Sequence, residues 1–421
     1  MKHLVFIDAN NAAIQSMDEA VKQGFKVTFL RQSNVAFYQK NSYTQSVLSR
    51  LDNIIDMENG TDADELVRLL NTILQGDVID GVIAPNEPSL EAVAEACQRC
   101  NIPFTDPQGV KNARDKRQAR AILQEQGVPT IRNWVAHTTE EARAIFTQYT
   151  PPFIFKPVSG FDSLYAIKVS TPEQVEAASA DILNAALSGA QTYQNIFSRG
   201  ILIEEFLQGT LLSAEVGIYN CTFYEFMISG RCQSRFNECI ELGSLMPAAI
   251  TPEQKKACFH YAKAVCAALR LDYGIFHIEI MYTANGPILV EANPRLMGGV
   301  MPEIYRQATG VSVYPALFTI ATQADAPIAL PAANRAVTVR KVMPLADGVT
   351  APEFTTDDIS THPNIVNFYS DKLTPARKVA KNEVLGRIMV SHPNLDEANK
   401  IADTILSDIE RRIGVEIHQP L

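Results

Sequence analysis

The sequence predicts a protein of mixed α/β and α+β class, with a parallel sheet first and antiparallel strands later in the chain. Residues 1–105 alternate short apolar segments with helical ones, a pattern typical of strand–helix–strand units in a parallel sheet. Residues 213–242 hold successive strand-like segments with no helical segment between them, which indicates a meander. Two further apolar segments, 274–283 and 286–293, are joined by an Asn-Gly turn, a strong short-range signal of a hairpin.

The N-terminal part is expected to form one parallel sheet with helices between its strands. The segments expected as strands are residues 4–7, 26–30, 53–56 and 79–84. The segments with helical periodicity are residues 10–24, 62–74 and 87–100. Parallel sheets of this kind bind ligands at the carboxyl ends of their strands. The first strand-to-helix turn lacks the G-x-G-x-x-G pattern, so the sequence does not favour a dinucleotide at this place.

The middle of the chain is expected to form a small α+β module. Its predicted elements are helices at 112–127 and near 172–188, and strands at 151–158, 166–169 and 201–207. A small polar loop, residues 159–165, follows the strand that ends near Lys156. After the meander we expect a helix at 252–270, then the hairpin, and a last region of strands with a helix at 394–413. Because no repeat or long linker separates these parts, we expect them to pack as one compact unit.

Composition and charge exclude several classes of protein. Of the 421 residues, 46% are hydrophobic and 20% are charged, as in an ordinary globular chain of two or three domains. The 37 basic and 47 acidic residues give a net charge of −10, which argues against binding to nucleic acid or anionic lipid. No hydrophobic run reaches the ~18 residues that a membrane span needs, and the N-terminal segment reads as a strand rather than a signal peptide.

The seven cysteines are dispersed along the chain, which favours a reducing cytoplasm over a disulfide framework. Cys97 and Cys100 lie within a helical pattern, and no second pair follows at the spacing of a zinc site. We therefore interpret them as ordinary helix thiols and expect a cytoplasmic protein.

The predicted hairpin is the most informative segment for chemistry. Residues two apart on a strand share a face, so Glu291 and Asn293 point the same way, and the hairpin can bring Glu279 opposite them. Two carboxylates and an amide oxygen form a hard-oxygen site suited to Mg²⁺. An exposed acidic sheet face is the alternative interpretation. The strands are otherwise apolar, however, and isolated acids on such strands are rarely buried without a partner.

Basic residues supply the second half of the candidate site. Lys156 ends an apolar strand and Lys116 lies in the helix after the first sheet, and lysine is a frequent partner of phosphate groups. Backbone N–H groups of the loop 159–165 could cover phosphates. Arg295 continues the alternation of the second hairpin strand and could hold a negatively charged group beside the metal. These residues together predict a phosphate site next to the hairpin.

The order of these features along the chain resembles that of the ATP-grasp superfamily of carboxylate–amine ligases. The features are the two lysines, the polar loop, the segment Glu-Glu-Phe-Leu at 204–207 and the carboxylate hairpin. The resemblance covers nearly the whole chain, and its most specific mark is E-x-N-x-R at 291–295 with Glu279 upstream. It implies an ATP-grasp fold, in which a Rossmann-like parallel sheet precedes a small lid module and a larger α+β module. The domains implied are 1–111 for the N-terminal sheet, 112–207 for linker helices and lid, and 208–421 for the metal-bearing module.

The resemblance also implies a role for each candidate residue. Residues expected to contact ATP are Lys116, Lys156, Ser159, Ser163, Glu204, Glu205, Phe206, Leu207 and Glu215. In this set the lysines match phosphate contacts, and the segment 204–207 matches the hinge that reads adenine and whose acid can take the ribose hydroxyls. Glu279, Glu291 and Asn293 match the ligands of two Mg²⁺ ions, which Mn²⁺ could replace. Arg295 matches the catalytic arginine that contacts the transferred phosphate or the intermediate.

Within the superfamily, the chain looks most like the L-amino acid ligases that form dipeptides, because of the segments 241–248 and 293–299. This likeness implies that Glu241 meets the ammonium group of the first amino acid, and that Gly298 and Gly299 present N–H groups to its carboxyl group. The sequence departs from the pattern at Ser244, a substrate-side position where many relatives have His. The loop 159–165 also has one glycine where relatives often have several.

The resemblance implies a ligase that phosphorylates a carboxylate with ATP and joins the acyl phosphate to an amine, with amino acids as substrates and a homodimer as the assembly. His277 shares a strand face with Glu279 and is a candidate base for the amine; Arg231 and Arg235 are candidate carboxylate contacts. One alternative is an ATP-grasp ligase of purine or natural-product biosynthesis that acts on a non-peptide acid. A biotin-dependent carboxylase is less favoured, because no biotin-carrier segment is seen. Another alternative is a non-catalytic nucleotide-binding protein on the same fold.

Overall fold

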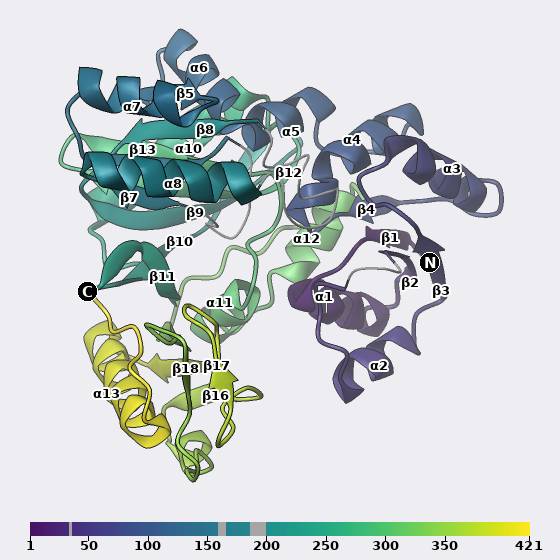
Figure 1. Ribbon diagram of the computed structural model, residues 1–421. Coiled ribbons are helices and arrows are strands. Elements are labelled where there is room, and N and C mark those ends of the chain that lie inside the picture. The colour runs from purple at the N-terminus through teal and green to yellow at the C-terminus, as the bar shows by residue number, and fades with distance from the viewer. Residues whose placement is uncertain (33–35, 159–165, 186–198) are drawn as a thin grey trace.

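The computed structural model describes residues 1–32, 36–158, 166–185 and 199–421, and it confirms the predicted mixed fold (Figure 1). Three groups of strands form the main sheets of the described chain. Their residues fall within 1–111, 112–207 and 208–421, and this division into domains stays a proposal. Over the same described ranges, no helix combines the length and the apolar character that a membrane crossing requires.

The first sheet is parallel, as predicted, and has the strand order β3-β2-β1-β4. Its strands are β1 (His3–Ile7), β2 (Lys26–Gln32), β3 (Asn53–Met57) and β4 (Gly81–Ile83). The helices of this part are α1 (Asn11–Lys22), α2 (Ser42–Leu48), α3 (Ala63–Leu74) and α4 (Leu90–Arg99), with the 3₁₀ turn η1 (Glu87–Ser89) before α4. Helix α2 was not predicted, because it is only two turns long and buries little more than Thr44 and Val47. The carboxyl ends of β1 and of the edge strand β4 lie side by side.

A break between two helices, which the sequence did not predict, determines the position of the candidate residue Lys116. The single helix expected at 112–127 is two helices, α5 (Pro107–Arg114) and α6 (Lys116–Glu125). Asp115 has an extended backbone between them and caps α6, because its side chain accepts a hydrogen bond of 2.9 Å from the Gln118 N–H. Lys116 therefore begins α6, and its backbone N–H donates to the carbonyl of Val158 at 3.3 Å. This bond ties Lys116 to the end of the strand that carries Lys156.

The small module is an antiparallel sheet of order β5-β8-β6-β7, covered by two helices. Its elements are β5 (Asn133–Ala136), α7 (Thr139–Gln148), β6 (Phe153–Pro157), β7 (Ile167–Val169), α8 (Pro172–Ala185) and β8 (Ile201–Glu205). Phe153, Phe155 and Ile203 pack against α7 and α8 in one buried cluster. Since side chains alternate along a strand, Lys156 and Glu204 point to the opposite face.

The largest sheet runs β13-β12-β9-β10-β11-β14-β18-β16 across the rest of the chain (Figure 1). Its strands are β9 (Thr210–Tyr219), β10 (Thr222–Ser234), β11 (Asn237–Met246), β12 (Gly274–Thr283), β13 (Gly286–Asn293), β14 (Ala336–Val342), β16 (Ile365–Tyr369) and β18 (Gly386–His392). Helix α10 (Pro252–Leu269) covers the face of Phe276 and Ile278, which leaves the alternate residues His277 and Glu279 on the other face. The hairpin strands have the predicted bounds.

The last part of the chain completes this sheet. Helix α13 (Leu395–Ile413) packs on β14 and β18 in a cluster that includes Val342, Ile388 and Leu406. Shorter elements are the pair β15 (Gly348–Val349) and β17 (Lys378–Val379), and the turn η2 (Ile359–Thr361). Strands β14, β18 and β16 therefore extend the same sheet that carries the hairpin.

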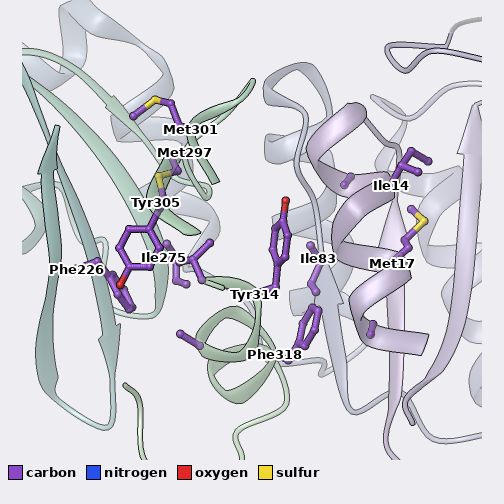
Figure 2. Close-up of a cluster of buried hydrophobic side chains, with 14 of the residues drawn as sticks. Ile14, Met17, Ile83, Phe226, Ile275, Met297, Met301, Tyr305, Tyr314 and Phe318 are labelled. Atoms are coloured by element: carbon purple, nitrogen blue, oxygen red, sulfur yellow. The ribbon is translucent and has the colours of Figure 1, made fainter. Parts of the chain in front are cut away.

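A shared hydrophobic cluster joins the first sheet to the largest one, as Figure 2 shows. Helices α11 (Met301–Thr309) and α12 (Tyr314–Ala321) lie between them. Tyr314 and Phe318 of α12 belong to the same buried cluster as Ile14 of α1, Ile83 of β4 and Ile275 of β12. Because this buried cluster includes residues of both sheets, it fixes the carboxyl ends of β1 and β4 relative to the β12–β13 hairpin.

Candidate active site

A cavity of about 1010 Å³ lies between the open face of the small sheet and the β12–β13 hairpin. Its lining brings together most of the residues predicted to hold a nucleotide, although they are scattered along the sequence. These are Lys116, Lys156, Glu204, Glu205, Phe206, Leu207, Glu279 and Glu291. Glu238 and Cys239 of β11 also line the cavity and had not been predicted. Ser159 and Ser163 lie outside the described residues.

A buried carboxylate in this cavity is shared by two cations. Glu204 Oε2 lies 2.6 Å from Lys156 Nζ, and Glu204 Oε1 accepts a hydrogen bond of 2.9 Å from Arg120 Nε. Burial alone would raise the pKa of Glu204, but the charges of Arg120 and Lys156 outweigh it and lower the pKa below its usual range. Burial and the neighbouring cations lower the pKa of Lys156. The Glu204 side chain thus holds Lys156 in the cavity, whereas the hinge prediction had offered it for the ribose.

Arg120 was not predicted, and it connects the small sheet to the hairpin. It is 1% exposed, and its Nη2 donates a hydrogen bond of 2.6 Å to the carbonyl of Val290. A β-bulge leaves Val290 unopposed, because Glu279 pairs with Glu291 while Ile280 pairs with Leu289. Arg120 therefore links the bulge beside the two hairpin carboxylates to Glu204 on β8.

The segment after β8 has the exposed, irregular character expected of a hinge. Glu205 is the last residue of β8, and its carboxylate pairs with Arg132 on the outside. The backbone N–H of Phe206 donates to the carbonyl of Pro152 at 3.1 Å. Lys168 lies 3.9 Å from the centroid of the Phe206 ring and pairs with Glu238. An acid for the ribose hydroxyls is therefore available at Glu205 or Glu238.

The hairpin carboxylates face each other as the sequence predicted. Glu279 is the cross-strand neighbour of Glu291, and Asn293 is the neighbour of His277. Glu291 Oε1 lies 2.7 Å from Lys116 Nζ, and Glu279 Oε1 lies 3.2 Å from His277 Nε2. Each carboxylate is thus compensated by one basic group.

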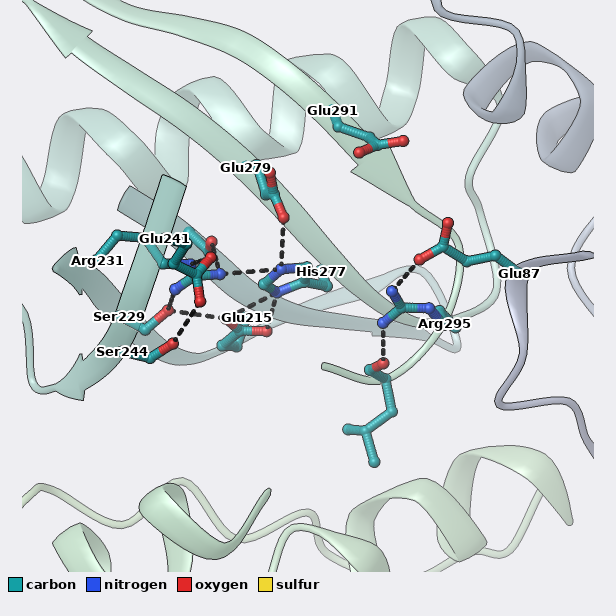
Figure 3. Close-up of polar contacts among 12 residues, drawn as sticks. Glu87, Glu215, Ser229, Arg231, Glu241, Ser244, His277, Glu279, Glu291 and Arg295 are labelled. Atoms are coloured by element: carbon teal, nitrogen blue, oxygen red, sulfur yellow. Dashed lines mark hydrogen bonds and ion pairs between the residues drawn. The ribbon is translucent and has the colours of Figure 1, made fainter. Parts of the chain in front are cut away.

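His277 lies between two carboxylates, as Figure 3 shows. Its Nδ1 is 2.9 Å from both oxygens of Glu215, whose Oε1 also accepts a hydrogen bond of 3.0 Å from Ser229. Burial would lower the pKa of His277, but Glu215 and Glu279 outweigh it and raise the pKa to about 9. An imidazole that is already protonated near neutral pH cannot accept a proton, so the structure does not favour His277 as the base. Glu215 lies on β9, directly beside His277 of β12, and does not line the cavity.

The donor set of the hairpin fits Mg²⁺. Among residues 1–32, 36–158, 166–185 and 199–421, no group of three or more His, Cys, Asp or Glu side chains is placed to hold a metal ion. Mg²⁺ usually keeps several waters and binds one or two carboxylates together with substrate phosphates. Glu279 and Glu291 line the cavity, and the amide of Asn293, two residues beyond Glu291 on β13, completes such a partial set.

The substrate-side residues form a separate polar cluster on β10, β11 and β14. Glu241 Oε2 lies 3.0 Å from Arg231 Nε, and its Oε1 lies 3.6 Å from Lys341 Nζ and accepts a hydrogen bond of 3.3 Å from Ser244. Arg231 Nη2 reaches Ser213 at 2.7 Å and lies 3.1 Å from His277 Nε2 (Figure 3). The cluster therefore joins Glu241 to the hairpin. Arg235, in contrast, is exposed and packs on Phe236 outside the cluster.

Arg295 faces the N-terminal sheet, on the other side of the hairpin (Figure 3). Its Nη2 donates to the Glu87 carboxylate, and its Nη1 donates to the carbonyl of Leu296 at 2.9 Å. Arg295, Gly298 and Gly299 line a second, polar cavity of about 1650 Å³ that lies between the carboxyl ends of β1 and β4 and helix α11. The structure thus brings three of the predicted substrate residues together, but it places Glu241 and Ser244 in the other cluster.

Comparison with protein families agrees with this architecture. Residues 149–303 match the model of the ATP-grasp domain, and residues 17–104 match that of the ATP-grasp N-terminal domain. The two stretches together make up more than half of the chain. The chain belongs to the ATP-grasp superfamily. The predicted family is therefore confirmed, and strands β6, β7 and β8 of the small sheet and the hairpin lie inside the matched ATP-grasp domain.

Individual ATP-grasp relatives are distant. The chain is 25% identical over 274 residues to the alanine–anticapsin ligase of Bacillus amyloliquefaciens, covering 61% of this chain and 57% of that protein. It is 26% identical over 293 residues to carnosine synthase 1 of Mus musculus, covering 67% of this chain and 34% of that protein. The chain thus spans less than two thirds of the length of either. The structure of an L-amino acid ligase from Bacillus licheniformis has a TM-score of 0.81 at 19% identity, over 100% of this chain and 99% of that one, which shows a shared fold.

Besides Glu238 and Cys239, two further residues of this ATP-grasp site, Glu87 and Arg120, were not predicted. Glu87 lies four residues beyond the end of β4, and the general preference of parallel sheets for ligands at their carboxyl ends was a signal that could have found it. Arg120 had no such signal, because it reads as one more basic residue on an amphipathic helix.

Proposed function

We propose that the protein is an ATP-dependent carboxylate–amine ligase that joins the carboxylate of one amino acid to the amine of a second, forming a dipeptide. The observation that supports this most directly is the pairing of Glu279 with Glu291 at the edge of a cavity that Lys116 and Lys156 also line. The carboxylates suit Mg²⁺ and the lysines suit phosphate, so the cavity fits a metal-bound triphosphate.

The chemistry begins with a carboxylate, which is a poor electrophile. Its oxygen takes the γ-phosphoryl group of ATP, the bond to ADP breaks, and an acyl phosphate forms. The amine nitrogen then attacks the carbonyl carbon, inorganic phosphate leaves, and the amine loses a proton. For such transfers a protein contributes mainly positioning and charge neutralisation. Bound Mg²⁺ would supply part of that neutralisation.

This chain's own residues have separate parts in that scheme. Lys116 and Lys156 hold phosphate oxygens, and the backbone of Phe206 and Leu207 borders the base. Arg295 holds the carboxylate that is activated, together with the N–H groups beside Gly298 and Gly299. These assignments are supported by the shared cavities described above.

Amino-acid substrates are supported by the charge of the substrate-side cluster and by the names of the relatives. Glu241 offers an anion for an ammonium group, while Arg231 and Lys341 offer cations for a carboxylate. The alanine–anticapsin ligase and carnosine synthase bear names of amino-acid ligases. We extend the proposal to small-molecule partners alone and to a cytoplasmic location. We also propose a homodimer, which light scattering of the purified chain would test.

A substrate panel tests the proposal. ADP release is measured with Mg²⁺ and ATP against single amino acids, pairs of amino acids and organic acids, with product mass as the second readout. Turnover that requires a pair of amino acids, with a dipeptide as product, supports it. Turnover with a non-peptide acid would instead support a purine or natural-product ligase on the same phosphate site. Binding of Mg-ATP without ADP release across the panel would favour a non-catalytic nucleotide-binding protein.

A further inference from the structure

Glu87 brings the N-terminal sheet into the active site. It is the first residue of η1 and lies four residues beyond the end of β4, the edge strand that pairs with β1. It is only 8% exposed, although it is a carboxylate. A buried carboxylate is stable only when it is paired and hydrogen bonded. The partners of Glu87 therefore indicate its role.

The two oxygens of Glu87 bind two different arginines. Oε1 accepts a hydrogen bond from Arg295 Nη2, and Oε2 lies 2.8 Å from Arg114 Nη1 on α5. Arg114 is also buried, so it anchors the carboxylate from the side opposite Arg295. Since Arg295 Nη1 is bound to the carbonyl of Leu296, the guanidinium is fixed by two acceptors.

The chain also leaves space for the guanidinium where it passes Gly298. A side-chain carbon at position 298 would lie 3.3 Å from Arg295 Nη1, which is tighter than an ordinary van der Waals contact. Glycine at this position therefore permits the observed place of Arg295. Glu87, Leu296 and Gly298 together determine the position of one guanidinium, and Glu87 and Gly298 line the second cavity.

We propose that Glu87 is a positioning residue that holds the Arg295 guanidinium where it meets the anionic group of the substrate. The proposal rests on the proposed function and adds to it that the N-terminal sheet sets the geometry of the candidate catalytic arginine. An unrestrained arginine side chain has several rotatable bonds, and ordering it during the reaction would raise the barrier. Glu87 removes that freedom before the substrate arrives.

The test compares kcat and KM of Glu87→Gln with those of the parent. Glutamine has nearly the same size but loses the charge that orders both arginines. Charge-assisted hydrogen bonds of this kind correspond to a fall of roughly 10- to 100-fold in kcat. The KM for ATP should stay within about 2-fold, because the nucleotide is held by Lys116, Lys156 and the hinge.

A double-mutant cycle separates positioning from a general structural role. In an Arg295→Met background, adding Glu87→Gln should change kcat no further, because no guanidinium is left to position. The matched control is Glu176→Gln, which removes a carboxylate of α8 whose exposed ion pair is with Arg143, and it should leave kcat within about 2-fold.

Several results would overturn the proposal. Parent-like kcat in Glu87→Gln would do so, and so would an equal loss of kcat in the Arg295→Met background. A rise in the amino-acid KM with unchanged kcat would also overturn it, because the loss would then lie in substrate binding and not in the ordering of Arg295 for the reaction. If the parent releases no ADP on any substrate, the proposed function fails, and NMR of the arginine side chains still decides the positioning role. The Arg295 signal, assigned by its loss in Arg295→Lys, should be averaged by rotation in Glu87→Gln; a signal unchanged from the parent would refute it.

Discussion

Replacing Glu204 by Gln removes the carboxylate that Arg120 and Lys156 share, and it should destabilise the protein. Both cations are nearly buried and lie 2.6–2.9 Å from its oxygens. Breaking a buried ion pair by removing one partner costs about 3 kcal/mol or more, because the remaining charge is left without compensation. For a domain of 150–250 residues, a loss of about 3 kcal/mol lowers the melting temperature by roughly 6–12 °C.

A nucleotide should partly repair this damage, and that is the specific part of the prediction. The phosphates of ADP bring negative charge to Lys156, so they replace what Glu204 supplied. The rise in melting temperature on adding Mg-ADP should therefore be larger for Glu204→Gln than for the parent. Thermal unfolding followed by circular dichroism, with and without Mg-ADP, measures both effects.

The neighbouring Glu205→Gln is the matched control. Glu205 pairs with the exposed Arg132, and such surface pairs contribute little to stability. Without nucleotide, its melting temperature should stay close to that of the parent. If Glu204→Gln melts within about 2 °C of Glu205→Gln, the ion-pair argument is wrong. If it is destabilised but gains no more from Mg-ADP than the parent, Lys156 does not meet the phosphates.

Three further outcomes are expected. Glu291→Ala should abolish ADP release while the far-ultraviolet circular dichroism stays that of a folded chain; release at the parent's rate would refute the metal assignment. The folded-state pKa of Glu204 is lowered, so the ionised carboxylate stabilises the fold above about pH 4.5, and this stabilisation is lost as the pH falls through the folded-state pKa. The melting temperature of Glu204→Gln should therefore fall less than that of the parent between about pH 5 and 3. Gly243→Ala should lower the melting temperature by several degrees, because the added carbon would overlap the carbonyl of Val339. The control Gly76→Ala should not, because its added carbon meets only open space and one distant carbonyl. Equal melting temperatures would show that the sheet adjusts at Gly243.

Local pattern was sufficient to predict the hairpin and the face that carries its acids. Asn285-Gly286 fixes the turn, and alternation along the strands then places Glu279 and Glu291 on one side. The bulge at Val290 could not be predicted in this way, because it depends on the carbonyl that Arg120 binds from another module.

Residues that act through long-range contacts were missed for a physical reason. The break at Asp115 interrupts a sequence whose helical pattern is continuous on both sides, so only the bond from Lys116 to Val158 reveals it. Glu87 looks like the ordinary acidic start of a helix, and only its two buried arginine partners distinguish it. His277 shares the face of Glu279 as predicted, but two carboxylates keep it protonated, which pattern alone cannot show.

The continuous sheet from β13 to β16 has a consequence for cutting the chain. The matched ATP-grasp domain ends at residue 303, but β11 is covered along its outer side by β14, which begins at Ala336. A chain that stops before Ala336 would leave β11 as an open edge with unpaired N–H and carbonyl groups, close to Glu241 and Ser244. Open edges of this kind recruit strands from other molecules. Such a fragment should self-associate, so the smallest piece that stays monodisperse and keeps the substrate side intact must include β14 and β18.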